Sequence, residues 1–286
     1  MRSLQILSFT IASLLFPLAR AVTYSSYAAS SAMIRGQGNG LSSGLPIVSY
    51  EHGEFQWALR LLYEHTGNVS YYNYIKAGVD QVVASDGSVG GGYNMSEYQL
   101  DPLRVGPSFI YLYDKTGEEK YKKAADIFRS QFFTHPRTAE GQFWHKLIYP
   151  NQGWLDGTYM GDIFYAAYTA AFEPTNQTAW NDILLQFTLM YDNTLQTPAS
   201  TGSNSTYTGL LYHGYDYSHE QDWASPDRGH SPEIWDRALG WYMMALVDVI
   251  PMFPSSNPAR TTLTTILDTL ATRLVTAAID DSTSGV

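Results

Sequence analysis

The sequence contains no cysteine among its 286 residues, which excludes a disulfide framework, a thiol nucleophile and thiolate metal ligands. Basic residues are also scarce, since 17 Lys and Arg stand against 27 Asp and Glu and give a formal net charge of −10. Nucleic acid and anionic membranes are therefore not expected as partners, because no basic stripe is present to displace their counterions. Stability must come from packing, for which 44% hydrophobic residues are sufficient.

Long apolar runs are confined to the first residues. Arg2 precedes the apolar stretch 6–18, and Ala19-Arg20-Ala21 has the small residues of a signal-peptidase site. The stretch is too short to span a bilayer, and no second run of this kind follows. We interpret residues 1–21 as a signal peptide and 22–286 as one domain of a secreted protein. A buried N-terminal helix is the alternative.

Four Asn-X-Ser/Thr sequons support export, because this motif accepts glycans in secreted proteins. They begin at Asn68, Asn94, Asn176 and Asn204.

A repeated segment organises the chain. Tyr63-Glu64-His65-Thr66-Gly67 is followed by Tyr71, and Tyr113-Asp114-Lys115-Thr116-Gly117 by Tyr121. A weaker copy runs from Phe172 to Trp180 with the same aromatic spacing. Each copy is typical of a helix that ends at a glycine and turns into the next helix. The sequence therefore predicts a series of helical hairpins.

Helical periodicity predicts about nine helices and no convincing strand. The expected ranges are 24–35, 51–66, 69–84, 103–115, 118–133, 158–172, 177–192, 232–250 and 258–279. The connections 85–102, 134–157 and 193–231 are long and rich in Gly, Trp, Tyr, His and Asp, so they gather at one end of the array as the candidate active face. Such hairpins suggest an all-α toroid, in which about three of twelve helices are missing.

The first candidate cluster surrounds Asp156. It runs from Phe143-Trp144-His145-Lys146 to Trp154-Leu155-Asp156-Gly157 and places a carboxylate among aromatic rings, a histidine and a lysine. Indole faces stack on the C–H surfaces of sugars, and apolar surroundings favour the protonated carboxyl group. The alternative is that Trp154 and Tyr159 are core residues and Asp156 caps the following helix.

The second cluster runs from Tyr212-His213-Gly214 to Trp235-Asp236-Arg237 and Trp241. Ser231 as an N-cap with Pro232 at the first helical position predicts a helix start. Arg237 and Trp241 are four residues apart and share a face, with Gly240 leaving room beside them. The planar guanidinium of Arg237 suits a uronate carboxylate, or it forms an ordinary ion pair with Asp236 or Glu233.

The sequence does not support a metal site, a nucleotide site or a serine nucleophile. The group His213, Asp216, His219 and Glu220 matches no strong ligand spacing, so no metal is expected. The glycine-rich stretches 36–40 and 90–92 follow no clear strand, which argues against nucleotide binding, and no Gly-x-Ser-x-Gly elbow is present. We expect no cofactor.

Taken together, the clusters resemble the unsaturated rhamnogalacturonyl hydrolases of glycoside hydrolase family 105, and more distantly the unsaturated glucuronyl hydrolases of family 88. The segments that carry the resemblance are Leu100-Asp101-Pro102, Thr134-His135-Pro136-Arg137 to Trp144-His145-Lys146, Trp154 to Met160, and Gly229-His230-Ser231-Pro232 to Arg237-Ala238-Leu239-Gly240-Trp241-Tyr242.

The resemblance implies that residues 22–286 form an incomplete (α/α)6-barrel catalytic domain. It also implies a substrate whose terminal uronic acid carries a C4=C5 double bond. It assigns catalysis to Asp156 as general acid and base, with Asp101 as the second carboxylate. It assigns the substrate pocket to His145, Trp154, His213, Trp235, Arg237 and Trp241. The like charge of Asp101 is expected to favour protonated Asp156. Two alternatives stay open: a family 88 type glucuronyl hydrolase, and a secreted sugar-binding protein without catalysis. The oligomeric state is not predicted.

Overall fold

The computed structural model describes residues 23–201 and 207–279. The expected signal peptide, 1–21, and the sequon at Asn204 lie outside these residues. Helices dominate the described part, and each of the nine expected ranges contains one, so the all-α prediction is confirmed. The helices are α1 (Tyr24–Ile34), α2 (Tyr50–Thr66), α3 (Val69–Asp80), α4 (Gly106–Thr116), α5 (Glu119–Gln131), α6 (Leu155–Gly157), α7 (Ile163–Phe172), α8 (Gln177–Thr194), α9 (Asp236–Val249) and α10 (Ala259–Ile279).

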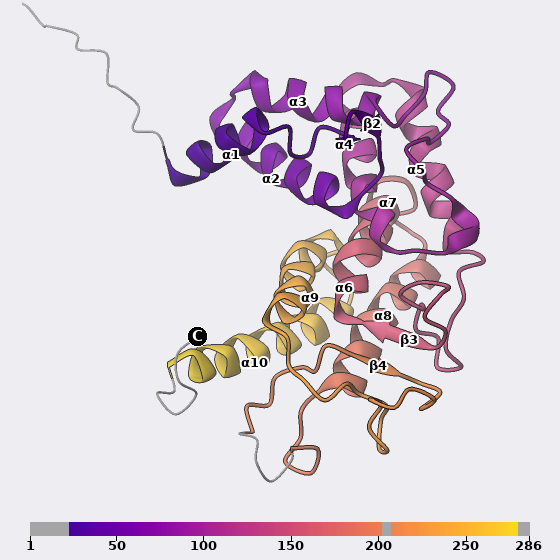
Figure 1. The fold of residues 1–286 in the computed structure, drawn as a ribbon, viewed down its shortest axis with the longest axis vertical. Helices are drawn as coiled ribbons and strands as arrows, with labels where there is room; N and C mark the ends of the chain where they lie inside the picture. Colours follow the sequence, from indigo (N-terminus) through magenta and orange to yellow (C-terminus); the bar gives the residue numbers. More distant parts are fainter. Residues whose placement is uncertain (1–22, 202–206, 280–286) are drawn as a thin grey trace, which may run out of the picture.

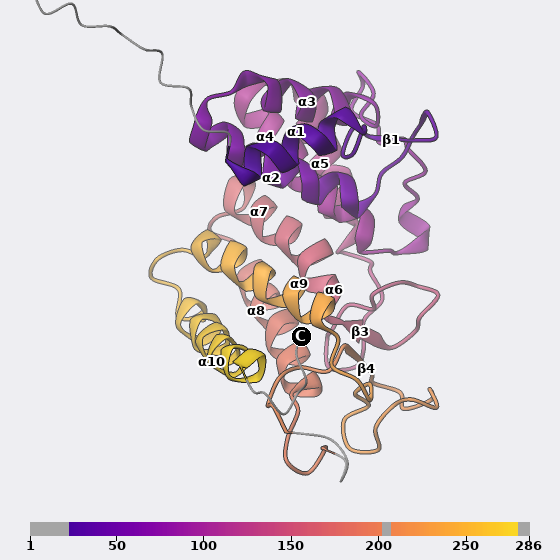
Figure 2. The ribbon, with the colours of Figure 1, turned by 60° about the vertical axis from the view of Figure 1, so that its left-hand side comes forward.

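Consecutive helices form hairpins, and the hairpins follow one another around an open arc (Figure 1). Figure 2 shows the same order from the side, with α1 to α5 above, α7 in the middle and α9 and α10 below. Gly67 and Gly117 end α2 and α4 with φ of 67° and 68°, the left-handed conformation that the repeat predicted. Within the described ranges the hairpins do not close into a ring.

Helical spacing correctly identified the buried face of α5. Tyr121, Ala124, Ala125 and Phe128 are 0% exposed, and Phe132, just after the helix, is 4% exposed. These side chains belong to one hydrophobic cluster that extends from α1 to α10. Burial of this apolar surface, rather than any covalent link, holds the hairpins together.

The last helix, α10, is an exception to the expectation that only the N-terminus is strongly apolar. By length and composition alone it is the one helix among the described residues that could cross a membrane. Leu263, Ile266 and Leu270 are nevertheless buried in the common core. We therefore describe α10 as part of the helical array.

Two predicted helix starts are wrong. The helix expected at 232 begins at Asp236, and Ser231 is not its N-cap, because the backbone of residues 231–233 is engaged with residues 213–214. Ser231 N donates to Gly214 O at 2.8 Å, and His213 N donates to Glu233 O at 3.1 Å. The helix expected at 158 begins at Leu155 and passes through a π-helical segment, η3 (Thr158–Asp162), before α7.

Short strands, which the sequence did not predict, form two antiparallel pairs. They are β1 (Leu41–Ser42) with β2 (Leu45–Pro46), and β3 (Gln152–Trp154) with β4 (Gly214–Asp216). Each strand has two or three residues, too few to show an alternating pattern. The second pair lies in the long connections and positions the candidate site.

Candidate active site

The pairing of β3 with β4 brings the two sequence clusters together. Trp154 lies opposite Gly214 in the register, and Leu155 N donates to His213 O at 3.0 Å. Because Asp156 stands two residues after the end of β3 and His213 directly precedes β4, their side chains meet at the end of this ladder. The backbone hydrogen bonds between these two segments therefore explain why Asp156 and His213 are adjacent.

Asp156 is not the helix N-cap of the alternative interpretation. Trp154 occupies the N-cap position of α6, and Asp156 lies in its first turn. The Asp156 carboxylate instead contacts the imidazole of His213, with 3.0 Å between Oδ2 and Nε2. The Asp156 side chain is 15% exposed, so it is largely shielded but open to a ligand. His213 thus engages one oxygen of the carboxylate, Oδ2.

The second carboxylate, Asp101, is brought to the same face by further backbone bonds. Leu100 N donates to His145 O at 3.2 Å, and His145 N donates to Gln152 O at 2.8 Å. Gly157, one residue after Asp156, permits this approach, because a Cβ there would lie 3.0 Å from Leu100 Cδ1. Segments far apart in the sequence thus converge beside Asp156.

The Asp101 carboxylate is an ion-pair centre. His145 Nε2 lies 3.2 Å from its Oδ1, and Lys146 Nζ lies 2.6 Å from its Oδ2. Burial raises the pKa of Asp101, but the hydrogen bonds and positive charge of His145 and Lys146 outweigh burial and lower it to about 2. Asp101 is therefore ionised at neutral pH, and its charge is largely offset by these partners.

Asp101→Asn is expected to lower the free energy of unfolding by about 2 kcal/mol at neutral pH, since a pKa held below its ordinary value reports that much stabilisation of the charged form. This contribution is complete above the ordinary pKa of 3.8 and is lost as the pH falls through the folded pKa of about 2. Urea unfolding at neutral and acidic pH measures it. Asp114→Asn, at a carboxylate 71% exposed, is the control. A difference between Asp101→Asn and the unmutated chain that does not shrink in acid would contradict the ion-pair explanation.

Trp154 lies between the two histidines. Its ring is stacked on that of His145, with centroids 4.6 Å apart and 17° between planes, and its centroid lies 5.3 Å from that of His213. Trp235 also contacts His213, edge to face, with ring centroids 4.8 Å apart. The aromatic lining predicted around Asp156 is therefore assembled in the structure as one contiguous set.

Trp241 contributes a second aromatic surface from α9. It stacks on Tyr159 at 4.8 Å and meets Tyr50 edge to face at 6.4 Å. Tyr159 is 1% exposed, as its interpretation as a core residue required. The buried ring of Tyr159 thus supports Trp241 by stacking on it.

Arg237 stands one helical turn before Trp241 on α9. Its guanidinium carbon lies 4.2 Å from the centroid of the Trp235 ring. Asp236 Oδ1 accepts a hydrogen bond from the Arg237 backbone N, and among the described residues no carboxylate forms an ion pair with the Arg237 side chain. Gly240 beside it has open space where a Cβ would be. The cation is thus exposed, supported by an indole and available to an anionic ligand.

Sequence reasoning assigned no role to two further residues. Lys146, the partner of Asp101, was visible only as the neighbour of His145. Tyr50, the first residue of α2, had no signal of its own. Burial and the negative charge of Glu51 raise the pKa of Tyr50. The charge of Arg237 lowers this pKa and the charge of Asp101 raises it, so Tyr50 lies near both groups. Tyr50 thus connects the Asp101 side of the site with the Arg237 side.

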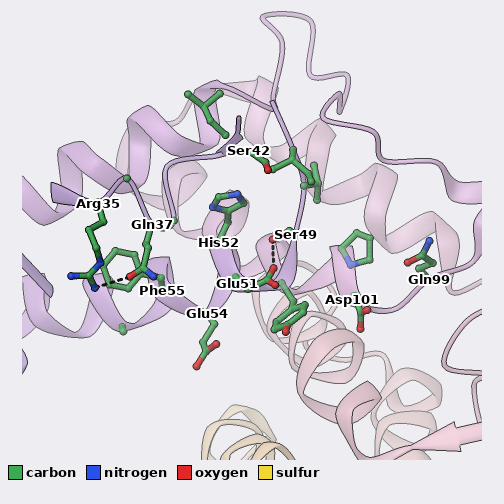
Figure 3. A pocket seen from close by; sticks show the side chains of 18 residues that line it. Arg35, Gln37, Ser42, Ser49, Glu51, His52, Glu54, Phe55, Gln99 and Asp101 are labelled. Carbon is green, nitrogen blue, oxygen red and sulfur yellow. Dashed lines mark hydrogen bonds between the residues drawn. The ribbon is translucent and has the colours of Figure 1, made fainter. Parts of the chain in front are cut away.

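A cavity of about 870 Å³ extends from Asp101 and Tyr50 along α2. Figure 3 shows Asp101 and Gln99 at one end and Arg35 and Gln37 at the other. Three carboxylates line it, those of Glu51, Glu54 and Asp101. The guanidinium of Arg35 also lines the cavity, at the end away from Asp101, so the end near Asp101 and Glu51 is the acidic one.

Gly214 holds the two strands together at close range. A Cβ at this position would lie 2.6 Å from Gly153 O and 3.0 Å from Trp154 Cδ1. Gly214→Ala should therefore separate β3 from β4, destabilise the fold by about 1–3 kcal/mol and move His213 away from Asp156. Thermal unfolding and turnover measure both effects. Gly240→Ala, where a Cβ meets nothing within 4 Å, is the matched control, and equal stability changes in the two variants would contradict this account.

The polar loop after β4 has an internal structural role. Asp216, 1% exposed, accepts hydrogen bonds from Ser218 N, Ser218 Oγ and Gln221 N at 2.6–2.9 Å. His219 Nδ1 lies 2.9 Å from Ser225 O. Among the described residues, no group of three or more His, Asp and Glu side chains is arranged to hold a metal ion.

Comparison with known proteins identifies the family of the chain. A family model described as Glycosyl Hydrolase Family 88 matches residues 32–285. The chain belongs to glycosyl hydrolase family 88. The resemblance to families 105 and 88 that the sequence motifs suggested is confirmed. The structure of a family 105 glycoside hydrolase from C. acetobutylicum is 37% identical in sequence and superposes with a TM-score of 0.80, over 89% of this chain and 66% of that chain.

Two further proteins are similar to this chain, one at low identity over most of its length and one at higher identity over a short stretch. A possible family 105 member from Klebsiella pneumoniae is 19% identical, with a TM-score of 0.70 over 98% of this chain and 73% of that chain, and it supports the fold alone. A 24.9 kDa protein in the picA locus of Rhizobium radiobacter is 44% identical over 69 residues, which are 24% of this chain and 30% of that protein. The chain described here therefore spans 66% of the length of the C. acetobutylicum protein. Its match to the 24.9 kDa protein covers 30% of that protein.

Proposed function

We propose that the chain is a glycoside hydrolase that releases the unsaturated (C4=C5) galacturonyl residue from oligosaccharides produced by rhamnogalacturonan lyases. The observation that carries the proposal is the Asp156 carboxylate, held by His213 among indole faces with the free cation of Arg237 on the same aromatic set. A protonatable carboxyl, a flat apolar surface and a carboxylate-binding cation are the three groups that an unsaturated uronide requires.

The chemistry needs one carboxyl group that first donates and then accepts a proton. Protonated Asp156 gives its proton to C4, and the C4=C5 electron pair forms the new C–H bond, which leaves an oxocarbenium-like centre at C5. The Asp156 carboxylate then takes a proton from a water whose oxygen bonds to C5. The hemiketal opens to a ketone at C5, and the hemiacetal left at C1 expels the neighbouring sugar as an alcohol. One water is consumed, and Asp156 ends protonated as it began.

His213 and Asp101 have supporting roles in this scheme. When Asp156 is a carboxylate, His213 donates a hydrogen bond from Nε2 to Oδ2 and leaves Oδ1 to work at C4 and C5. Asp101 is ionised and engaged by His145 and Lys146, so we assign it to orienting the site and binding sugar hydroxyls rather than to proton donation. The general acid and base is then Asp156 alone.

A family 88 type unsaturated glucuronyl hydrolase is the alternative, favoured by the family model that matches the chain. Both candidates use the same carboxyl chemistry on the same unsaturated uronate, because the C4=C5 double bond removes the C4 configuration that distinguishes galacturonate from glucuronate. They differ in the neighbouring sugar and its linkage. We expect faster turnover of unsaturated galacturonyl-rhamnose than of unsaturated chondroitin disaccharide. The reverse order of kcat/KM would favour the glucuronyl alternative.

We also propose that the protein is exported and glycosylated. Asn68 and Asn94 are exposed at helix starts, and each side-chain oxygen accepts from the backbone N two residues on at 3.1 Å. The Asn176 amide nitrogen is instead hydrogen-bonded to Glu173 Oε2 at 2.9 Å. Expression in a glycosylating host followed by N-glycosidase treatment is expected to show glycans at Asn68 and Asn94. An unglycosylated product retained inside the cell would contradict the proposal.

A further inference from the structure

Arg104 is a charged side chain shut off from solvent. It lies in the short helix η2 (Asp101–Val105) and is 0% exposed. Within residues 23–201 and 207–279, its Nε and Nη1 atoms have no hydrogen-bond partner. Removing a charge from water is costly unless specific contacts offset the loss of hydration. The contacts that Arg104 does make therefore indicate what it is for.

The principal contact of the Arg104 guanidinium is Tyr159. Nη2 donates a hydrogen bond to the Tyr159 hydroxyl at 2.8 Å, and the guanidinium carbon lies 4.2 Å from the centroid of the Tyr159 ring. The same carbon lies 5.1 Å from the centroid of the Trp57 ring on α2. A cation that faces an aromatic ring and also bonds its hydroxyl restricts where that ring can lie.

This hydrogen bond joins the two segments that carry the carboxylates of the site. Arg104 stands three residues after Asp101, the first residue of η2. Tyr159 stands three residues after Asp156, in the π-helical segment η3 that continues α6. The bond between Arg104 and Tyr159 therefore restrains η2 and α6–η3 relative to each other.

Tyr159 extends the restraint to α9. Its ring, 1% exposed, is stacked on that of Trp241 with 4.8 Å between centroids and 23° between planes. Trp241 is part of the aromatic surface of the site. Fixing the Tyr159 ring thus fixes the plane on which Trp241 rests.

The backbone of η2 is restrained separately by α2. A Cβ at Gly53 of α2 would lie 2.3 Å from Arg104 O and 2.7 Å from Val105 N, so the two helices meet at backbone distance. The Arg104 main chain is therefore packed against α2 while its side chain is bound to η3. Arg104 connects three segments that are far apart in the sequence.

We propose that Arg104 is a positioning residue, which acts through the Tyr159 hydroxyl to fix Asp101, Asp156 and Trp241 relative to one another. This inference rests on the proposed function, which assigns these three groups to one reacting site. Because Arg104 is fully buried, it acts on the reaction only through its neighbours. Small displacements of reacting groups lower the rate strongly, so the placement of Asp156 should be sensitive to this hydrogen bond.

Tyr159→Phe removes the hydroxyl and keeps the ring that stacks on Trp241. With both chains folded at the assay temperature, we expect kcat on unsaturated galacturonyl-rhamnose to fall about tenfold and KM to change less than about twofold. Tyr121→Phe is the matched control, because it removes the hydroxyl of another tyrosine, 0% exposed, that is bonded to a charged side chain, Asp80, at 2.7 Å. Unchanged kcat in Tyr159→Phe, or an equal loss in Tyr121→Phe, would overturn the proposal.

A double-mutant cycle tests whether Arg104 acts through Tyr159. Arg104→Met should lower kcat at least as much as Tyr159→Phe, and combining the two changes should lower kcat no further, because the second change removes a bond already lost. Additive losses would contradict action through the hydroxyl. If Arg104→Met does not fold, Tyr159→Phe and its control decide the question alone.

A spectroscopic measurement separates positioning from catalysis. In the folded chain without substrate, the indole N–H resonance of Trp241, identified by its loss in Trp241→Phe, should shift in Tyr159→Phe and stay in place in Tyr121→Phe. If the unmutated chain does not turn over the disaccharide, the proposed hydrolase function fails, and this resonance alone decides the positioning role. An unshifted Trp241 resonance in Tyr159→Phe would overturn that role whether or not the chain is active.

Discussion

Replacing Asp156 by asparagine is expected to reduce kcat on an unsaturated galacturonyl disaccharide by at least about 10³-fold, because general acid and base catalysis contributes on the order of 10²–10⁴ and one group supplies both steps here. An amide cannot give a proton to C4. The asparagine oxygen can still accept the hydrogen bond that His213 Nε2 makes over 3.0 Å to Asp156 Oδ2. The fold and the aromatic set should therefore stay intact.

Steady-state kinetics and thermal unfolding of Asp156→Asn separate catalysis from stability. The variant should unfold at the same temperature as the unmutated chain and still bind the disaccharide. Asp268→Asn, at an exposed carboxylate on α10, is the matched control and should retain full activity. Full turnover by Asp156→Asn would remove this residue from the mechanism.

Replacing Arg237 by alanine is expected to lower kcat/KM about 10²-fold, mainly through KM. Hydrogen bonds to charged groups contribute about 1.5–3 kcal/mol, and each 1.4 kcal/mol is a factor of ten. The guanidinium lies over Trp235 without a carboxylate partner in the described residues, so its loss leaves no protein anion unpaired. The effect should thus come from the substrate carboxylate.

A substrate esterified at that carboxylate provides the internal control for Arg237→Ala, because it should lose little further activity in the variant. Arg237→Lys should recover part of the loss, since the ammonium keeps the charge without the planar fork. Arg228→Ala removes an arginine already paired with Asp227 and should leave KM unchanged. Equal losses on the free acid and the ester would contradict carboxylate recognition by Arg237.

Much of the helical architecture could be predicted because its signals are local. The glycine after each repeated helix and the apolar spacing of α5 are set by backbone conformation and burial within a few residues. The start of α9 could not be predicted. Ser231 and Pro232 have the residue types of a helix start, but the Ser231 backbone N is hydrogen-bonded to Gly214 O, seventeen positions earlier in the sequence.

The candidate site shows the same limit. Residue types around Asp156 and Arg237 indicated a sugar site, yet the contact of Asp156 with His213 depends on the β3–β4 pairing, whose strands are too short to show a pattern. Lys146 and Tyr50 gain their places only through long-range packing against Asp101 and Trp241.

The ultraviolet absorbance of the C4=C5 enol ether provides the most direct test of the central claim. Unsaturated galacturonyl-rhamnose incubated with the 286-residue chain should lose this absorbance while one equivalent of rhamnose is released, and Asp156→Asn should cause neither change. Binding of the disaccharide by the unmutated chain with the absorbance intact would contradict the hydrolase account and favour a sugar-binding protein.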